Sequence, residues 1–552
     1  MKKYILPILL LFLFQSCTQE ASVNLENAQE SITEESLIRH IEILSSDEFE
    51  GRAPATPGEE LTVSYIVDQL EAMGIAPGMP DGSFVQEFPL LGQQVNRETS
   101  SFVIRKEGEI AENLEFGTQF MAWPSNEEER IQVENAEVVY VGYGVVAPEY
   151  GWNDFKDVDV SGKILVFKNN DPSHDPEIFE GDARLYYGRW SYKFEIAEEM
   201  GALGAIIIHT TPTAGYGWSV VENSWGRERF AVQREAFNPD EVPQFNSWLT
   251  QESSAALFSL AGLSLDEMLE AAADREFSPV TLEGITIEAD LSATYSNMYA
   301  KNVIGKIEGA DRTLRDEFVI FSAHHDHLGV DVDGVSIYNG AHDNASGVAS
   351  VLEIANSLKQ IESSLKRTVL FMFVGAEEMG LLGSRYWAEN PTVHPGKVSA
   401  NINLDSVQIY GETNDQVVIG YGRNNMTDLF REHVEAEGRV VKPDPRPEQG
   451  SFYRSDHFSY ARVGIPAFYP NSGRDFVNKP ENWSAVIDSV NAANYHTVND
   501  VINEYWDMAG MVKDMRLMFR FAVDVINHDS MMEWVPGDEF EAVRMEMLRD
   551  AQ

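Results

Sequence analysis

Residues 318–347 read FVIFSAHHDHLGVDVDGVSIYNGAHDNASG, and this stretch decides the fold. The apolar run 318–321 is typical of a buried strand, and a loop rich in Gly and Asp follows it. The stretch 342–344 stands just before a periodic apolar segment, which predicts the start of a helix. In open α/β sheets, ligands bind beyond the carboxyl ends of the strands. Several candidate metal ligands gather at this strand end: His324, His325, Asp326 and His327.

Acidic residues follow two later strands in the same way. The run 368–374 predicts a buried strand that ends next to Glu377 and Glu378, and a strand over 400–404 ends at Asp405. Two adjacent carboxylates repel each other unless a cation offsets their charge. A metal ion can do so, with one carboxylate binding the ion and the other taking a proton from water. His496, far along the chain, adds a further candidate ligand.

The order of elements predicts the fold class. From residue 318 onward, apolar strand segments alternate with amphipathic helical segments. This alternation predicts an α/β fold with a largely parallel sheet. The chain of 552 residues is long enough for two or more domains, and a strand-rich block follows a charged break at 126–130.

The charge balance excludes one class of partner. The chain has 41 Lys and Arg against 89 Asp and Glu, which gives a net charge of −48. Nucleic-acid binding needs a positive face, so we expect no nucleic acid among the partners. The sequence does not indicate the oligomeric state.

The first residues have the features of an export signal. Lys2 and Lys3 precede an apolar run over 4–14, and Cys17 follows Gln-Ser. The run is too short to span a bilayer comfortably. Cys17 is the only cysteine of the chain, and its position resembles a bacterial lipoprotein signal in which this residue is lipidated. We expect an exported lipoprotein of the cell envelope (periplasm or outer membrane), anchored in the membrane by its lipid; the alternative is an ordinary signal peptide.

The separated motifs resemble those of the two-zinc aminopeptidases of metallopeptidase family 28. That family has a His-x-Asp after a strand, an Asp-Asn before a helix, a Glu-Glu pair, an Asp and a late His. The matching positions are 324–326, 343–347, 377–378, 405 and 496. The segment 453–457, followed by Gly-Ile-Pro at 464–466, is similar to the wall of the family's substrate pocket.

The resemblance implies a role for each of these residues. Two Zn²⁺ ions would be held by His324, Asp343, Glu378, Asp405 and His496. Asp343 would bridge the ions, and Glu377 would be the general base. Asp326 would orient His324, and Tyr495 would stabilise the oxyanion. Asp456 and Arg454 would belong to the substrate pocket. The spacing leaves open whether His325 or His327 contributes to the metal site.

The resemblance also implies a domain organisation. We expect a phosphorylase/hydrolase-like three-layer α/β/α sandwich with a mixed, largely parallel sheet. Three stretches of the strand-rich block that follows the charged break resemble the β-rich protease-associated domain: 141–148, 157–163 and 202–205. This domain would be inserted in the sandwich. The expected segments are a signal at 1–17, a tether at 18–31, the catalytic domain at 32–126 and 293–530, the insertion at 127–292, and a tail at 531–552.

The function implied is that of an exported zinc aminopeptidase, which releases N-terminal amino acids from peptides or proteins by means of metal-activated water. Two alternatives use the same scaffold: a carboxypeptidase with the same metal pair, and a glutaminyl cyclase with one zinc. A third is a binding protein that has lost its metals. The sequence does not identify the preferred N-terminal residue.

Overall fold

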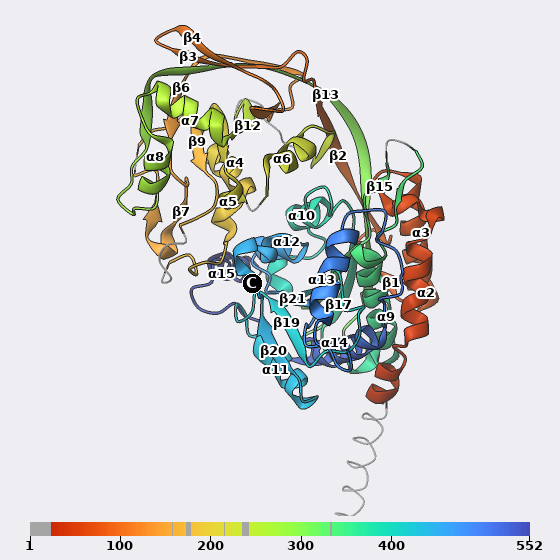
Figure 1. Cartoon of the computed structure of the whole chain (residues 1–552). Helices are drawn as coiled ribbons and strands as arrows, with labels where there is room; N and C mark the ends of the chain where they lie inside the picture. Colours follow the sequence, from red (N-terminus) through yellow and green to blue (C-terminus); the bar gives the residue numbers. More distant parts are fainter. Residues whose placement is uncertain are drawn as a thin grey trace, which may run out of the picture. The chain divides into compact units, whose positions relative to one another are not determined.

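The computed structural model describes residues 24–156, 158–172, 178–214, 216–233, 242–331 and 334–551. The chain divides into two units (Figure 1). Unit 1 comprises Met1–Phe88, Tyr299–Pro445 and Arg454–Gln552; unit 2 comprises Pro89–Met298 and Arg446–Tyr453. The predicted signal at 1–17, with Cys17, lies outside the described residues.

Unit 1 is built on a mixed sheet. Its strands, in spatial order, are β1 (Ala76–Pro77), the end of β13 (Val280–Ile307), β17 (Thr368–Val374), β14 (Phe318–His324), β18 (Val398–Asn403), β21 (Ala467–Asn471), β19 (Asp415–Ile419) and β20 (Val440–Pro443). The central strands β17, β14, β18 and β21 are parallel, whereas β13 and β19 pair antiparallel with their neighbours β17 and β21. The predicted mixed, largely parallel sheet is confirmed.

Helices cover both faces of this sheet. Successive side chains of a strand point to opposite faces, so Phe321 and Phe371 lie in one core cluster and Ile320 and Leu370 in another. The first cluster is completed by α2 (Glu34–Leu44), α3 (Pro57–Ala72), α9 (Ser346–Gln360), α11 (Met426–Ala436) and α14 (Ala509–Asn527). The second includes α10 (Leu382–Glu389) and α12 (His457–Arg462). The expected three layers are therefore present.

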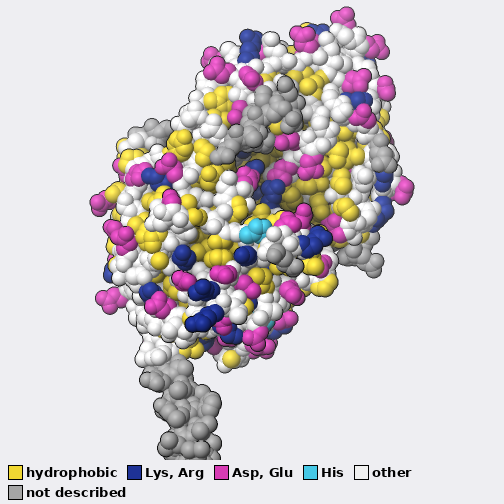
Figure 2. Space-filling view, turned by 180° about the vertical axis from the view of Figure 1, so that it is seen from behind, with side chains coloured by type: hydrophobic (Ala, Val, Ile, Leu, Met, Phe, Trp, Pro, Cys, Tyr) yellow, Lys and Arg dark blue, Asp and Glu magenta, His cyan; other side chains and the backbone are white. Residues whose placement is uncertain are grey.

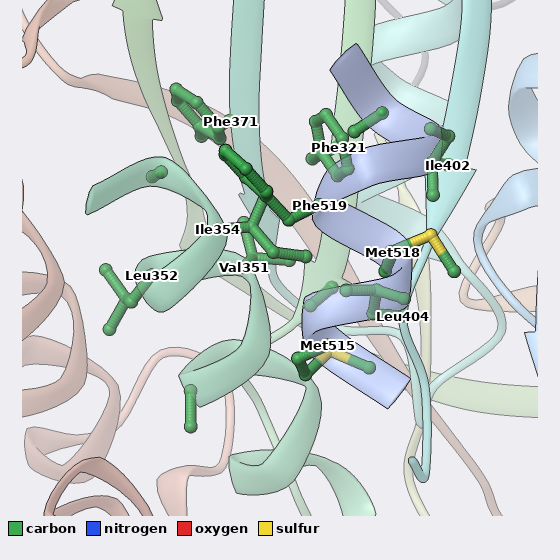
Figure 3. Packing of buried hydrophobic residues seen from close by; sticks show 14 of the residues in the cluster. Phe321, Val351, Leu352, Ile354, Phe371, Ile402, Leu404, Met515, Met518 and Phe519 are labelled. Atoms are coloured by element: carbon green, nitrogen blue, oxygen red, sulfur yellow. The ribbon is translucent and has the colours of Figure 1, made fainter. Parts of the chain in front are cut away.

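The core between α9, α14 and the sheet is closely packed. Figure 3 shows Met518 and Phe519 of α14 beside the strand residues Phe321 and Ile402. All four side chains are almost completely buried. Burying a side chain of this size stabilises the fold by about 1.5–3 kcal/mol. The packing on this face therefore holds the strands, and with them the strand ends, in place.

Both ends of unit 1 are more ordered than we predicted. Residues 24–30, expected to be part of a tether, form a helical segment with Ala28 fully buried. The expected tail at 531–552 contains α15 (Glu541–Asp550), and Met532 and Trp534 are buried. Both corrections have the same cause, because apolar side chains in these segments add to the core of unit 1. Unit 1 also contains α13 (Trp483–Asn494).

Unit 2 has a sheet of its own. Its strands, in spatial order, are β4 (Glu109–Leu114), β3 (Ser101–Lys106), the start of β13, β6 (Arg130–Tyr140), β9 (Ile164–Lys168), β10 (Gly204–His209), β12 (Phe245–Thr250) and β5 (Phe120–Pro124). Its helices are α4 (Trp190–Glu199), α5 (Thr211–Ala214), α6 (Trp218–Trp225), α7 (Gln251–Leu260) and α8 (Leu265–Ala271). β11 (Arg229–Val232) pairs with β2 (Val85–Val95).

The predicted start of the insertion at residue 127 lies inside unit 2, which begins at Pro89. The reason is strand pairing: β3 pairs with β13, and β5 pairs with β12. These partners lie more than a hundred residues away along the chain, so local sequence patterns do not reveal them. The end of the unit at Met298 lies close to the predicted residue 292.

The surface carries charges of both signs. Figure 2 shows Asp and Glu side chains scattered over one face of the molecule, among Lys and Arg side chains and apolar groups. None of the helices in the described part of the chain combines the length and the apolar character that crossing a bilayer requires.

Candidate metal centre

The candidate ligands lie at one edge of the unit 1 sheet. Strand β14 ends at His324, which is in register with Val374 at the end of β17, and Glu377 and Glu378 follow β17. Asp405 follows the end of the neighbouring strand β18. Parallel strands carry their carboxyl ends to the same edge, so the predicted positions meet there.

Asp343 enters the site from a turn just before α9. Gly340 begins this turn with φ 55°, a left-handed backbone that other residues rarely adopt. A Cβ atom at Gly340 would stand 2.3 Å from the carbonyl oxygen of Asp343 and 2.6 Å from the ring of His327. The close approach of these segments therefore requires glycine here.

A first group of donors surrounds His324. Its Nε2 lies 3.2 Å from Oδ1 of Asp343 and 3.5 Å from Oδ1 of Asp405. All three residues are buried. The second oxygen of Asp405 accepts a hydrogen bond of 2.6 Å from the hydroxyl of Ser455. One imidazole nitrogen and two carboxylate oxygens thus converge from three separate segments.

A second group shares Asp343 with the first. The Nε2 atom of His496 lies 3.0 Å from Oε2 of Glu378 and 3.3 Å from Oδ2 of Asp343. Asp343 therefore turns one oxygen toward each histidine, which is the arrangement expected of a bridging carboxylate. His327 stands behind this group, with its Nδ1 2.7 Å from Oε1 of Glu378.

The donor set fits two divalent metal ions. Three combinations have potential ligand atoms within 4.8 Å of one another: His324 with Asp343 and Asp405, His324 with Glu377 and Glu378, and His327 with Asp343 and Glu378. Among the residues that the structure describes, Nε2 of His496 has no hydrogen-bond partner, although carboxylate oxygens lie close to it. A nitrogen that shares space with carboxylates without bonding to them suits a common cation. Imidazole and carboxylate donors together are typical of zinc.

The two adjacent glutamates differ in their ionisation. Burial and Asp343 oppose the ionisation of Glu378, but His327 and His496 outweigh them and lower its pKa to about 2. Burial raises the pKa of Glu377 well above its usual value, and its neighbour Glu378 adds to this rise. Environments that separate two carboxylates in this way assign them different tasks. Glu378 suits a ligand, and Glu377, the more basic of the two, suits a proton acceptor once bound cations keep it ionised.

Asp326 supports the site from below. Its carboxylate is completely buried and accepts the backbone N–H groups of Glu377 at 3.0 Å and Glu378 at 3.3 Å. The ring Nδ1 of His324 lies 3.7 Å from this carboxylate and 3.2 Å from the backbone oxygen of Asp326. The carboxylate thus holds the glutamate backbone in addition to facing the histidine ring that we expected it to orient.

The remaining predicted residues have different surroundings. Tyr495 is 62% exposed, and its ring stacks on that of His496 with 3.8 Å between the centroids. Asp456 is fully buried, and burial raises its pKa to about 7. Its place in the substrate pocket stays a prediction. The side chain of Arg454 is exposed.

The structure distinguishes the two histidines whose part in the metal site the spacing left open. The ring Nε2 of His325 bonds to the carbonyl oxygen of Lys301 at 2.9 Å, so this ring belongs to the packing of the strand end. His327 instead contacts Glu378.

Sequence reasoning missed Asp500, whose carboxylate accepts the backbone N–H groups of His342 and Asp343 at 2.9 and 3.0 Å. Its only signal was an acidic residue four positions after His496.

A comparison with protein families agrees with this geometry. Residues 302–519 match peptidase family M28. This segment is an M28 peptidase domain. The matched range contains every predicted metal ligand, and the predicted resemblance is confirmed. The match lies within unit 1 except for 446–453.

Curated relatives resemble the M28 domain over part of their length. Leupeptin-inactivating enzyme 1 of Streptomyces exfoliatus is 28% identical over 185 residues, which is 33% of this chain and 41% of that protein. Aminopeptidase YwaD of Bacillus subtilis (strain 168) is 27% identical over 209 residues, 38% of this chain and 41% of that protein. The chain thus spans about two fifths of the length of these relatives.

A solved structure resembles more of the chain. An aminopeptidase from Aneurinibacillus sp. strain AM-1 aligns with a TM-score of 0.49 and 20% sequence identity, and the alignment covers 90% of this chain and 94% of that one.

Proposed function

We propose that the protein is a zinc aminopeptidase that removes N-terminal residues from peptides. The observation that carries this proposal is the shared position of Asp343 between the His324–Asp405 group and the Glu378–His496 group. The M28 match of the same segment supports it, as do relatives named as aminopeptidases.

The residues can divide the reaction between them. His324, Asp343 and Asp405 would hold one zinc ion, and Asp343, Glu378 and His496 the other. Zinc bound at such sites polarises a carbonyl group and lowers the pKa of water. Glu377 is the more basic carboxylate of the pair, so once the cations keep it ionised it can take a proton from the attacking water and deliver it to the leaving amine. Tyr495 is placed beside His496 and can donate a hydrogen bond to the developing oxyanion.

The substrate's free N-terminus would be recognised by the surrounding carboxylates. An ammonium group gains charge-assisted hydrogen bonds of about 1.5–3 kcal/mol each from such acceptors. Acetylation removes the charge and the donors. We therefore expect the affinity for the substrate to fall roughly ten- to a hundredfold from this effect alone, and steric exclusion would add to this loss.

The test compares three substrates with and without a chelator: an amino-acid p-nitroanilide, its N-acetyl form, and a peptide blocked only at its C-terminus. An aminopeptidase cleaves the first and the third and spares the second, and the chelator abolishes the activity. Equal rates on the free and the acetylated substrate would reject the proposal. Activity lost only on C-terminal blocking would indicate a carboxypeptidase.

We also propose that the protein is exported and anchored through a lipid on Cys17. The support is the basic start, the short apolar run and the single cysteine. A relative from Mycobacterium tuberculosis, 26% identical over 232 residues, is named a probable lipoprotein aminopeptidase. Cys17→Ala should move the protein from the membrane fraction to the soluble fraction without changing its specific activity. A variant that stays fully with the membranes would contradict the anchor.

Unit 2 is, in our proposal, the inserted protease-associated domain. The support is its separate sheet with the parallel strands β6, β9, β10 and β12, and the sequence resemblance within it. Such a domain would affect access for long substrates and not the chemistry. Replacing 89–298 by a short Gly-Ser linker should preserve the cleavage of amino-acid anilides and change the preference among peptides of different length. An unchanged preference would contradict this role.

A further inference from the structure

A buried arginine that is not a candidate ligand contacts the segments that carry the ligands. Arg52 ends a short 3₁₀ segment (Asp47–Arg52) and is 1% exposed. Its guanidinium donates to four backbone carbonyl groups and to no side chain that the structure describes. Nε bonds to His325 at 2.9 Å, and Nη2 bonds to Gly340 at 2.9 Å. Nη1 bonds to Leu44 and to Asn339, each at 2.6 Å.

These carbonyl groups belong to the segments that carry the ligands. His325 directly follows His324 at the end of β14, and Gly340 begins the turn that leads to Asp343. One planar guanidinium therefore spans two of the three segments that supply the first ligand group. Arginine presents five donors in a rigid fork, whereas lysine presents three donors on one atom. Only the fork can meet acceptors that diverge in this way.

The charge of Arg52 also suits this place. Burying a cation is unfavourable unless polar partners satisfy it, and here four carbonyl groups do so. Burial lowers the pKa of Arg52 to about 10, and the nearby carboxylates of Asp500, Asp326 and Asp343 act against this shift. The group therefore stays cationic at neutral pH and offsets part of the negative charge of the site.

We propose that Arg52 is a positioning residue for the metal centre: its guanidinium fixes the spacing between the His324 segment and the Asp343 segment before a metal ion binds. The inference rests on the proposed function only in that the centre holds zinc. It assigns no contact between Arg52 and the metal or the substrate.

The test uses Arg52→Lys, with Arg367→Lys as the matched control. Arg367 is likewise fully buried; its Nη1 donates to the carbonyl group of Ile526 at 3.3 Å, and its Nε donates to the carboxylate of Glu317 at 2.8 Å. It immediately precedes β17, at the end of the sheet opposite the ligands. Both variants lose a buried fork that joins separate parts of the chain, so both should lower the melting temperature of the chelator-treated protein. Only the first changes the metal centre.

The readouts are the zinc affinity, measured by competition with a chromogenic chelator, and the absorption spectrum of the cobalt-substituted protein. We expect Arg52→Lys to weaken zinc binding by about tenfold or more, as for other groups that orient ligands, and to change the cobalt spectrum. Arg367→Lys should leave both as in the wild type. Zinc affinity of Arg52→Lys within twofold of the wild type, or an equal loss in both variants, would overturn the proposal.

A measurement on the wild type covers the case in which Arg52→Lys does not fold. Backbone amide exchange of the metal-free protein should show segments 325–327 and 341–343 protected if both keep their places without zinc. The N–H groups of His342 and Asp343 bond to Asp500, so this exchange tests the preset spacing and not the Arg52 bonds themselves. Exchange there as fast as at the exposed residues 498 and 499 would overturn the proposal. If the wild type binds zinc but cleaves no aminoacyl substrate, only the proposed activity fails. If it binds no zinc, both fail.

Discussion

The carboxylate of Asp326 accepts the backbone N–H group of Glu377 in a hydrogen bond of 3.0 Å. Its second oxygen accepts the N–H group of Glu378 at 3.3 Å. A single buried side chain therefore sets the position of the residue proposed as the base and of the residue proposed as a ligand. Because Asp326 is completely buried, water cannot replace either bond.

Replacing the Asp326 carboxylate should affect both the proposed base and the proposed ligand. In Asp326→Asn, one oxygen becomes an NH₂ group that faces a backbone donor, so one of the two bonds is lost. We expect activity or zinc affinity to fall by about 10- to 100-fold, as for other groups that orient ligands. The measurement is kcat together with zinc affinity. Asp316→Asn, at an exposed position before the same strand β14, is the control and should leave both unchanged. Wild-type values in Asp326→Asn would show that the two bonds do not position the site.

The adjacent glutamates should respond differently to the same change. Glu377→Gln removes a proton acceptor, so turnover should fall by about 10²–10⁴-fold while the zinc content stays close to that of the wild type. Glu378→Gln removes a ligand that His327 and His496 hold ionised, so zinc should be lost. Kinetics and metal analysis on both variants check this. Loss of zinc from Glu377→Gln instead would mean that the two roles are reversed.

Zinc binding should depend most strongly on the shared carboxylate. We expect two zinc ions per chain in the wild type, and a melting temperature that rises with zinc because the metal binds the folded state. Asp343→Asn should weaken both sites, because Asp343 faces His324 and His496 alike. Asp405→Asn should weaken only the site at His324. Calorimetric titration of the chelator-treated proteins distinguishes these cases. Two intact sites in Asp343→Asn would contradict the bridging position.

The sequence predicts the strand ends of the site well, for a physical reason. His324 and Glu378 each follow an apolar run that must be buried, and parallel pairing brings both to one edge. The supporting residues are harder to find. Arg52 acts through backbone carbonyl groups, which any residue can supply, and it lies in a Gly- and Pro-rich loop without periodicity. Asp500 likewise bonds only to backbone N–H groups.

Unit boundaries were predicted less well, because they depend on distant pairing. The start of unit 2 at Pro89 is set by strands that pair with β13 and β12, far along the chain. No local charge or composition signal marks that position. The charged break at 126–130 is instead the start of strand β6 and its approach, within the unit.

The stability of unit 1 should depend on pH through Glu59. This carboxyl group is fully buried in α3, and burial raises its pKa from 4.5 to about 7. Between these values the folded chain holds a proton that the unfolded chain has released. The contribution of Glu59 to the free energy of unfolding is therefore fully present below pH 4.5. It falls by roughly 3 kcal/mol as the pH rises to about 7.

Glu59→Gln keeps a neutral group at that place and should remove this dependence. Urea unfolding of chelator-treated protein between pH 5 and pH 8 measures it: the variant should gain stability relative to the wild type as the pH rises. Glu71→Gln, at an exposed position of the same helix, is the control and should run parallel to the wild type. A constant difference between Glu59→Gln and the wild type over this range would contradict the raised pKa.

The C-terminal segment should contribute to stability, and Trp534 tests this. The indole is 5% exposed, and its N–H donates to the carbonyl group of Gly464 at 3.1 Å. Its ring packs on Phe540 with 5.3 Å between the centroids. Trp534→Ala removes this contact area and leaves a cavity, so unfolding by urea should require about 3–5 kcal/mol less free energy. Val535→Ala, at a neighbouring side chain that is 38% exposed, should change it by less than about 1 kcal/mol. If both variants unfold like the wild type, the packing around Trp534 does not hold residues 531–552 to unit 1, and the segment is the tail that the sequence predicted.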